Sequence, residues 1–339
     1  MRLLTPTLAG VFALSVSFLL PVSAQQAAPP PAAPAQTPAA PAGGRARGAG
    51  PVQQMVWSPK AVKPTGYTGV HKPHTKLADV LAKHKGQTDW VESIVDDETL
   101  HGDYIMMGPG KKTPKRANVD TREWWIVRDG QIRFTIDGQE PFVVSKGFLV
   151  QVPYRTFYTM ETVGDQPSLR YEVNIARARK IYPAEETPVP VPGVEYVRAR
   201  IAGRGNYEDS NRMKVDFNQV AAGAERGGEW IADRNGFANI ILGRGGPAPD
   251  PANKGHFHVE SSEHWMIMLG QIHYTIEGVP PFVAEVGDIV YVPKQTWHLA
   301  SPFGDGQTCR LAMNAFSDLG HSYEAAPAAG GRGTGRGPR

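Results

Sequence analysis

Hydrophobic and polar residues alternate over short segments through most of the chain. Segments such as QIHYTIEG (271–278) and DIVYVP (288–293) are rich in β-branched and aromatic residues and are bounded by Gly or Pro. They predict β-strands, and many short strands at regular spacing are typical of a sandwich or a barrel. A clear helical period occurs near LADVLAKHK (77–85). The pattern therefore predicts an all-β protein with one short N-terminal helical segment.

The strand pattern occurs twice along the chain. When the second half is moved back by 140 residues, it aligns with the first half without a gap from Arg116/His256 to Met160/Ala300. This offset predicts that one domain was duplicated, because self-similarity at a fixed spacing is typical of repeated units. The identical pairs include Glu123/Glu263, Trp125/Trp265, Gly130/Gly270, Gly138/Gly278, Gly147/Gly287, Pro153/Pro293 and, outside the gapless stretch, Trp90/Trp230.

Composition sets the limits of the two copies. The segments that flank them are rich in Ala, Pro, Gly and Arg, and such segments cannot bury a core. A Pro-rich stretch between the copies indicates an extended connection. We therefore expect a signal peptide at 1–24, a disordered linker at 25–50, a first β-rich copy at 51–182, a linker at 183–200, a second β-rich copy at 201–320 and a disordered tail at 321–339.

The first 24 residues have the three parts of a secretory signal. Arg2 is followed by an apolar run from Leu8 to Leu20, and Val22-Ser23-Ala24 forms a small-residue cleavage site before Gln25. The apolar run is too short and too interrupted by Pro and Ser to predict a membrane span. We expect a Sec-type signal and a periplasmic or extracellular protein.

The formal net charge of +3 does not indicate a nucleic-acid partner. Six arginines and one acid (Glu324) lie in the signal, linker and tail, and removing their +5 leaves the folded part at about −2. A nucleic-acid-binding domain carries its basic charge on the fold, so we expect no nucleic-acid partner. The single cysteine, Cys309, lies in an apolar alternation and is expected to be a buried structural thiol.

The densest chemical signal is GHFHVESSEHWMIMLG, from Gly255 to Gly270. His256 and His258 are two residues apart, so on a strand both side chains point to the same face. Glu263 can supply an oxygen ligand and His298 a third nitrogen. Three nitrogens and a carboxylate suit one divalent transition metal, and this donor set does not decide between Mn, Fe, Cu, Ni and Zn.

These residues resemble the two motifs of the cupin superfamily. His256, His258, Glu263 and Gly270 match the spacing of the first motif, and Gly287, Pro293 and His298 match the second. The resemblance implies a bicupin, a pair of jelly-roll barrels. The sequence departs from it in two places, both at a turn: Gln295 replaces the usual Gly, and no Asn follows His298 at the family position.

The first copy retains only the glutamate of the four ligand positions. The remaining three carry Arg116, Asn118 and Tyr158 beside Glu123. A guanidinium stays protonated and cannot bind a metal, so we expect the first barrel to be metal-free. Two roles stay open for its pocket: a purely structural partner of the second barrel, or a site for an organic anion or a sugar.

Two further residues of the second copy are candidates for other roles. Glu260 has the parity of His256 and His258, so it is a candidate general base, or a rim carboxylate with no chemical role. His264 alternates with Glu263 and should face away from the site, toward the surface or the other barrel.

The resemblance and the ligand set together predict a function class. Cupins with this ligand set are commonly dioxygenases, decarboxylases or lyases, so we expect a metal-dependent oxidoreductase or lyase that acts on a small aromatic or organic-acid substrate. A non-catalytic secreted cupin that binds a sugar, an organic acid or the metal is the alternative. The sequence leaves open whether the chain forms homo-oligomers.

Overall fold

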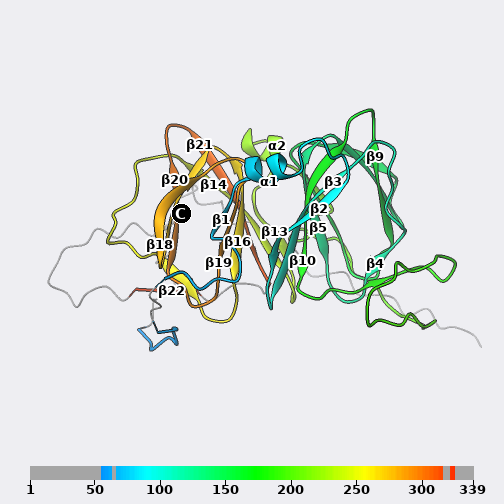
Figure 1. Ribbon diagram of the computed structural model, residues 1–339, viewed down its shortest axis with the longest axis horizontal. Coiled ribbons are helices and arrows are strands. Elements are labelled where there is room, and N and C mark those ends of the chain that lie inside the picture. Colours follow the sequence, from blue (N-terminus) through cyan, green and yellow to red (C-terminus); the bar gives the residue numbers. More distant parts are fainter. Residues whose placement is uncertain (1–54, 63–65, 316–320, 325–339) are drawn as a thin grey trace, which may run out of the picture. The chain divides into compact units, whose positions relative to one another are not determined.

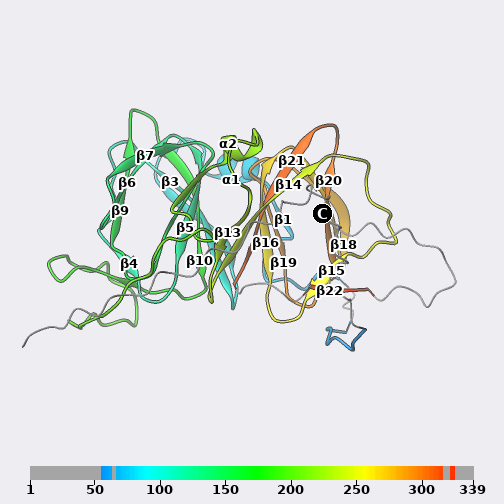
Figure 2. The ribbon, with the colours of Figure 1, turned by 180° about the vertical axis from the view of Figure 1, so that it is seen from behind.

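A computed structural model describes residues 55–62, 66–315 and 321–324, and within them the protein is almost entirely β-structure. Figures 1 and 2 show two barrels with two short helices, α1 (Leu77–Lys83) and α2 (Phe217–Ala221). The predicted fold class is confirmed, and α1 falls at the predicted helical segment. Among the described residues no helix is long and apolar enough to cross a membrane. The predicted signal peptide, the first linker and most of the tail lie outside the described residues.

The first barrel is formed by a six-stranded sheet, a three-stranded sheet and a two-stranded ladder. The six-stranded sheet has the order β12-β8-β5-β10-β3-β2, the three-stranded sheet β7-β6-β9, and the ladder joins β11 to β4. The strands are β2 (Trp90–Asp96), β3 (Leu100–Met107), β4 (Ala117–Asn118), β5 (Glu123–Asp129), β6 (Gln131–Ile136), β7 (Phe142–Ser145), β8 (Phe148–Val152), β9 (Tyr158–Val163), β10 (Ser168–Ile175), β11 (Lys180–Ile181) and β12 (Lys214–Asp216).

The second barrel repeats this arrangement with two sheets. One sheet has the order β1-β19-β16-β21-β14-β13, and the other β18-β17-β20-β15-β22. The strands are β1 (His74–Thr75), β13 (Gly228–Ala232), β14 (Phe237–Arg244), β15 (His256–His258), β16 (Glu263–Leu269), β17 (Gln271–Ile276), β18 (Val279–Ala284), β19 (Ile289–Val292), β20 (His298–Phe303), β21 (Gln307–Asn314) and β22 (His321–Tyr323).

Three hydrophobic clusters explain why some strands are apolar on both faces. One cluster fills each barrel, and a third joins the sheets of the two barrels. On β5, Trp125 points into the first barrel while Trp124 packs in the joint cluster; on β16, Trp265 and Met266 divide in the same way. Each such fully buried large side chain stabilises the fold by about 1.5 to 3 kcal/mol. The continuous apolar runs are therefore the strands that separate the two barrels.

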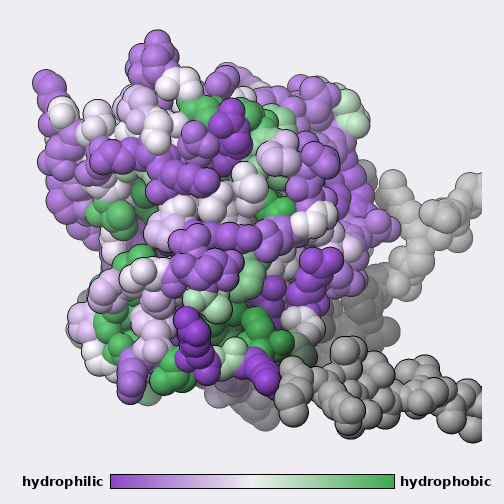
Figure 3. Space-filling view, turned by 90° about the vertical axis from the view of Figure 1, so that its right-hand side faces the viewer, coloured by the Kyte–Doolittle hydropathy of each residue, from purple (hydrophilic) through white to green (hydrophobic). Residues whose placement is uncertain are grey.

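Strands away from this joint cluster alternate, as expected for a sheet with one wet face. On β6 every second residue is buried in the first barrel, and the residues between them are exposed. Figure 3 views the side of the molecule on which β9 lies in Figure 1, and hydrophilic residues predominate on it. The alternation read from the sequence thus reports which face of each strand meets water.

Each barrel includes a short strand that comes from outside its own copy in the sequence. β1 precedes the first barrel in sequence but pairs with β19, with His74 opposite Val290. β12 follows the inter-barrel segment but pairs with β8 of the first barrel, with Lys214 opposite Val150. The predicted boundaries at residues 182 and 201 carry no signal for this exchange, because both strands are only two or three residues long.

Asp288 of the second barrel binds both β1 and the first residue of α1. Its carboxylate accepts hydrogen bonds from His74 Nε2 (2.7 Å) and from the backbone N–H of Leu77 (3.1 Å). Lys76 precedes α1 and offers no side-chain cap, so Asp288 caps the helix from the other half of the chain. Burial raises the pKa of Asp288, but the bonds from His74 and from the amides of Glu285 and Leu77 outweigh it and hold the pKa below its usual value.

Replacing the Asp288 carboxylate should weaken the attachment of β1 and α1 to the second barrel. We expect Asp288→Ala to lower the free energy of unfolding by about 1 to 3 kcal/mol, because buried donors lose their acceptor. The contribution should be present above pH 4 and disappear as the pH falls through the lowered pKa of Asp288. Urea titrations at several pH values measure it, and Asp305→Ala, at an exposed turn, is the control. Equal stability of the two variants at neutral pH would contradict this role.

Candidate metal centre

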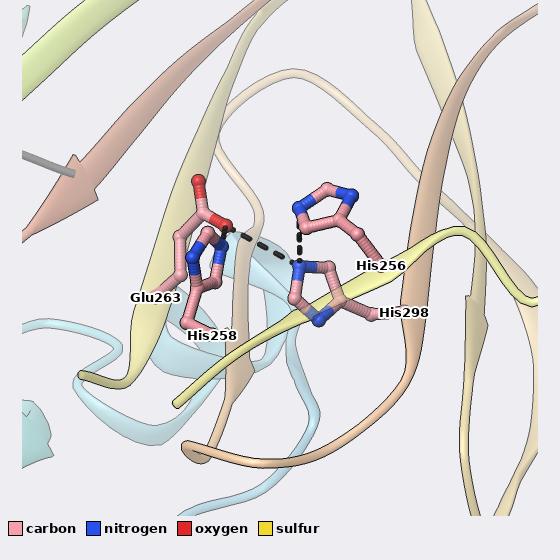
Figure 4. Close-up of side chains that lie close together, drawn as sticks. All are labelled: His256, His258, Glu263 and His298. Atoms are coloured by element: carbon pink, nitrogen blue, oxygen red, sulfur yellow. Dashed lines mark hydrogen bonds and ion pairs between the residues drawn. The ribbon is translucent and has the colours of Figure 1, made fainter. Parts of the chain in front are cut away.

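Three strands bring the four predicted ligands together. His256 and His258 lie on β15 and share a face, as the two-residue spacing predicts. His298 is the first residue of β20 and lies directly opposite His256. Glu263 begins β16, on the other sheet of the barrel. Figure 4 shows the four side chains converging between these strands.

The spacing of the four ligand atoms fits a single ion. All of them lie within 4.8 Å of one another. Glu263 Oε2 is 2.8 Å from His258 Nε2 and 3.4 Å from His298 Nε2, and the Nε2 atoms of His298 and His256 are 3.1 Å apart. Two ligands about 2.1 Å from an ion and at right angles are roughly 3.0 Å apart. The cluster could therefore hold one metal ion, as the sequence predicted.

His256 and Glu263 are held in the protonation states that a metal requires. Burial lowers the pKa of His256 to about 2, so its imidazole is neutral and its lone pair is available. Burial alone raises the pKa of Glu263, but hydrogen bonds from His258 and His298 outweigh it and lower the pKa well below its usual range. His256 therefore presents a neutral imidazole beside the Glu263 carboxylate anion.

Backbone contacts orient the ligands. His298 Nδ1 is 2.9 Å from the Thr296 carbonyl, which can only accept, so Nδ1 carries the proton and Nε2 faces the site. Gln295, which stands where the cupin motif has Gly, adopts a left-handed backbone with φ of 59°. Its N–H donates to the His258 carbonyl (2.6 Å) and ties this turn to β15. The substitution for Gly thus leaves the turn intact, at a cost of about 1 kcal/mol.

A scan of protein-family models and a search of curated proteins give no match to this chain. Solved structures do match. The salicylate 1,2-dioxygenase from Pseudaminobacter salicylatoxidans is 12% identical with a TM-score of 0.51, over 74% of this chain and 86% of that chain. A mutant of the same dioxygenase in complex with gentisate gives the same identity and TM-score, over 75% and 84%. A Lactobacillus farciminis oxalate decarboxylase in complex with formate is 15% identical with a TM-score of 0.48, over 77% and 91%.

The protein has the bicupin fold. Identities this low establish the fold and leave the activity to be argued from the site. The two barrels, their common strand order and the His-His-Glu-His cluster confirm the resemblance first seen in the sequence motifs. Of the two barrels of this bicupin, the second carries the cluster.

The corresponding place in the first barrel is filled by the chain's own charges. Lys180 forms an ion pair with Glu123, the counterpart of the candidate metal ligand Glu263. Tyr158 donates a hydrogen bond to the same carboxylate, and Asn118 Nδ2 donates another at 3.0 Å. An ammonium thus stands where the second barrel could hold a metal ion. This pairing favours the structural role over an exchangeable ligand in the first barrel.

His321 joins the second site from a segment that the sequence assigned to the tail. In β22 it lies directly opposite His258, so both side chains share one face. Its ring centroid is 4.4 Å from that of His256 and 4.7 Å from that of His258. Lys180 lies opposite Asn118 in the same way, so His321 and Lys180 are counterparts. One inserted residue shifts this pair out of the 140-residue offset, which hid it from the gapless alignment.

Three other candidates lie outside the ligand cluster. Glu260 is exposed in a bend after β15, which ends at His258, so the strand parity does not carry it to the site. His264 faces away from Glu263, is fully buried, and packs edge-on against Tyr171 of the first barrel at 5.9 Å between ring centroids. Cys309 is a buried free thiol, as predicted.

The buried pair in the first barrel should be coupled. We expect Glu123→Gln to destabilise the protein by about 3 to 5 kcal/mol, because it leaves the Lys180 ammonium buried without its carboxylate. The double variant Glu123→Gln/Lys180→Met should lose less than the sum of the two single losses. Denaturant unfolding of the single and double variants measures the coupling, with Glu140→Gln at an exposed position as the control. If the losses of the two single variants simply add in the double variant, Lys180 does not balance the charge of Glu123 in place of a metal ion.

Proposed function

We propose that this bicupin is an exported metal-dependent enzyme of the dioxygenase or decarboxylase/lyase type that acts on a small aromatic or organic-acid substrate at the second barrel. The observation that carries the proposal is the cluster of His256, His258, Glu263 and His298, with ligand atoms at spacings that suit one ion. Protein ligands fill four positions, and an ion with five or six positions keeps one or two for a substrate. The fold shared with a salicylate dioxygenase supports this substrate class.

The chain's own residues define what such a site does. A bound divalent metal supplies a Lewis acid or redox centre that orients an oxygen-bearing substrate. Glu263 offsets part of the ion's charge, and the neutral imidazoles leave a net positive centre that attracts anions. The buried Trp265 ring packs against His298, with ring centroids 5.3 Å apart, and forms an apolar wall of the site. These features favour an anionic small molecule.

Metal content and turnover test this proposal together. The chain purified from Gln25 onward should hold one divalent metal ion, measured by elemental analysis. It should consume O2 or release CO2 with a substrate among salicylate, gentisate, aromatic diols and dicarboxylates. His256→Ala should lose the metal and at least 100-fold in rate, in line with the loss of a metal ligand. His273→Ala, in the same barrel but outside the cluster, is the control.

Two outcomes would contradict the enzyme. Metal bound without turnover on the whole panel would favour the non-catalytic binder, in which the same site holds a ligand without converting it. If the protein binds none of Mn, Fe, Cu, Ni and Zn, the assignment of a metal site is itself contradicted.

Export is a separate part of the proposal and rests on the residues before Gln25. In a bacterial host the full chain should appear outside the cytoplasm with Gln25 as its first residue, as shown by fractionation and N-terminal sequencing. Deleting residues 1–24 should retain it in the cytoplasm. A full-length cytoplasmic product that still begins at Met1 would contradict export.

A further inference from the structure

A largely buried carboxylate in the first barrel, Glu172, accepts two hydrogen bonds and lies beside a further cation. The Trp125 indole N–H donates to Glu172 Oε2 at 2.8 Å. Arg116 Nη2 lies 3.4 Å from Glu172 Oε1, and Arg170 Nε lies 3.6 Å from Oε2. Burial raises the pKa of Glu172, but the charges of Arg116, Lys180 and Arg170 outweigh it and hold the pKa far below its usual range. The first barrel is therefore built around an anion at this place.

The second barrel has the same strands in the same register. In the first barrel Glu172 on β10 lies opposite Trp125 on β5, and in the second Ala312 on β21 lies opposite Trp265 on β16. The duplication offset of 140 residues holds for both pairs. It also relates Arg170 to Arg310, each two residues earlier on the same face of its strand. The tryptophan and the arginine are thus present in both barrels, and the carboxylate only in the first.

Replacing Glu172 by Ala312 leaves the donors of the second barrel without their anion. Among the described residues no carboxylate lies within ion-pair distance of Arg310, and no acceptor bonds the Trp265 indole N–H. Arg310 is only partly exposed, and its Nε is buried without a hydrogen-bond partner. An unpaired guanidinium inside a barrel costs free energy unless an anion joins it.

Arg310 lies on the interior side of the barrel. Its neighbours in the ladder are Ile267 and Ile241, which both contribute to the hydrophobic cluster that fills the second barrel. Burial raises the pKa of Tyr274, another residue of this cluster, and the charge of Arg310 opposes that shift. The hydroxyl of Tyr274 is itself buried without a partner. The interior therefore holds two unsatisfied polar groups in addition to the Trp265 indole.

The position of Ala312, which corresponds to Glu172 in the first barrel, adjoins the candidate metal site. Arg116, which touches Glu172, is the counterpart of the metal ligand His256. Lys180, whose charge acts on Glu172, is the counterpart of His321 and pairs with the counterpart of Glu263. In the first barrel, then, an internal cation and an internal anion lie side by side. A metal ion and an external carboxylate would stand in the same relation in the second.

We propose that the second barrel binds the carboxylate of a small organic acid where Ala312 replaces Glu172, held by the Arg310 guanidinium and the Trp265 indole N–H beside His256. This subsite deepens the proposed function and rests on it, because the metal site forms the neighbouring wall. It limits the substrate to carboxylates and excludes neutral diols and sugars. Arg310 orients the substrate through its carboxylate while the remainder of the molecule faces the metal.

Calorimetric titration with benzoate, and with benzamide as its neutral analogue, tests the subsite. The full chain is loaded with Mn and its metal content is measured before each titration. Benzoate should bind and benzamide should not. Arg310→Met should weaken benzoate binding by about tenfold or more at unchanged metal content, as expected for lost charge-assisted hydrogen bonds. Arg310→Lys should recover part of the loss, and Arg244→Met, which removes an exposed arginine of the same barrel, should have no effect.

A second variant leaves Arg310 in place. Ala312→Glu restores the carboxylate of the first barrel, so it should pair with Arg310, raise the melting temperature and abolish benzoate binding while the metal is retained. Benzoate binding of wild-type strength in either Arg310→Met or Ala312→Glu would overturn the subsite, as would equal binding of benzoate and benzamide. If the wild type holds no metal, the proposed function fails, and the same titrations on the metal-free chain judge the subsite by its dependence on Arg310.

Discussion

A carboxylate buried inside each barrel is the constraint on which the rest of the structure depends. Glu123 and Glu263 begin equivalent strands, and neither side chain is more than slightly exposed. A buried anion is costly unless a cation or several hydrogen bonds compensate it. The first barrel supplies Lys180 from its own chain. The second surrounds Glu263 with three imidazoles, and the four side chains could together hold a metal cation.

This constraint explains how one duplicated domain has two chemical outcomes. With Arg116, Asn118 and Tyr158 at three of the ligand positions, the first barrel lacks the candidate metal-ligand set, and a lysine from the β11–β4 ladder balances the charge of Glu123. The first barrel then serves as a packing partner whose six-stranded sheet shares a hydrophobic cluster with the second. Its internal cation and anion, Lys180 and Glu172, also lie in the arrangement that we propose for a metal ion and a substrate carboxylate in the second barrel.

The sequence predicted the ligands and the fold because both follow from simple periods. His256 and His258 share a face through the two-residue repeat of a strand, and Glu263 and His298 follow at motif spacing. Alternation and the 140-residue offset predicted two copies of one β-rich domain, and the resemblance to cupins implied that each is a barrel. Burial on both faces of β5 and β16 likewise follows from their continuous apolar runs.

The remaining features depend on contacts between distant segments. β1, β12 and β22 are two or three residues long, and so short a strand leaves no periodic signal. His321 sits beside Gly- and Ala-rich sequence that predicts no structure by itself. The parity of Glu260 fails because β15 ends at His258, and the sequence does not mark that end. The contrast between Ala312 and Glu172 gains meaning only when the register places Arg310 and Trp265 around them.

The most direct test of the charge-balance account is a crystal structure of the full chain grown with Mn, with anomalous scattering used to locate the ion. The account predicts one anomalous peak, within bonding distance of His256, His258, Glu263 and His298, and a Lys180 ammonium against Glu123 with no peak beside it. A peak at Glu123, or none at Glu263 under saturating Mn, would contradict it.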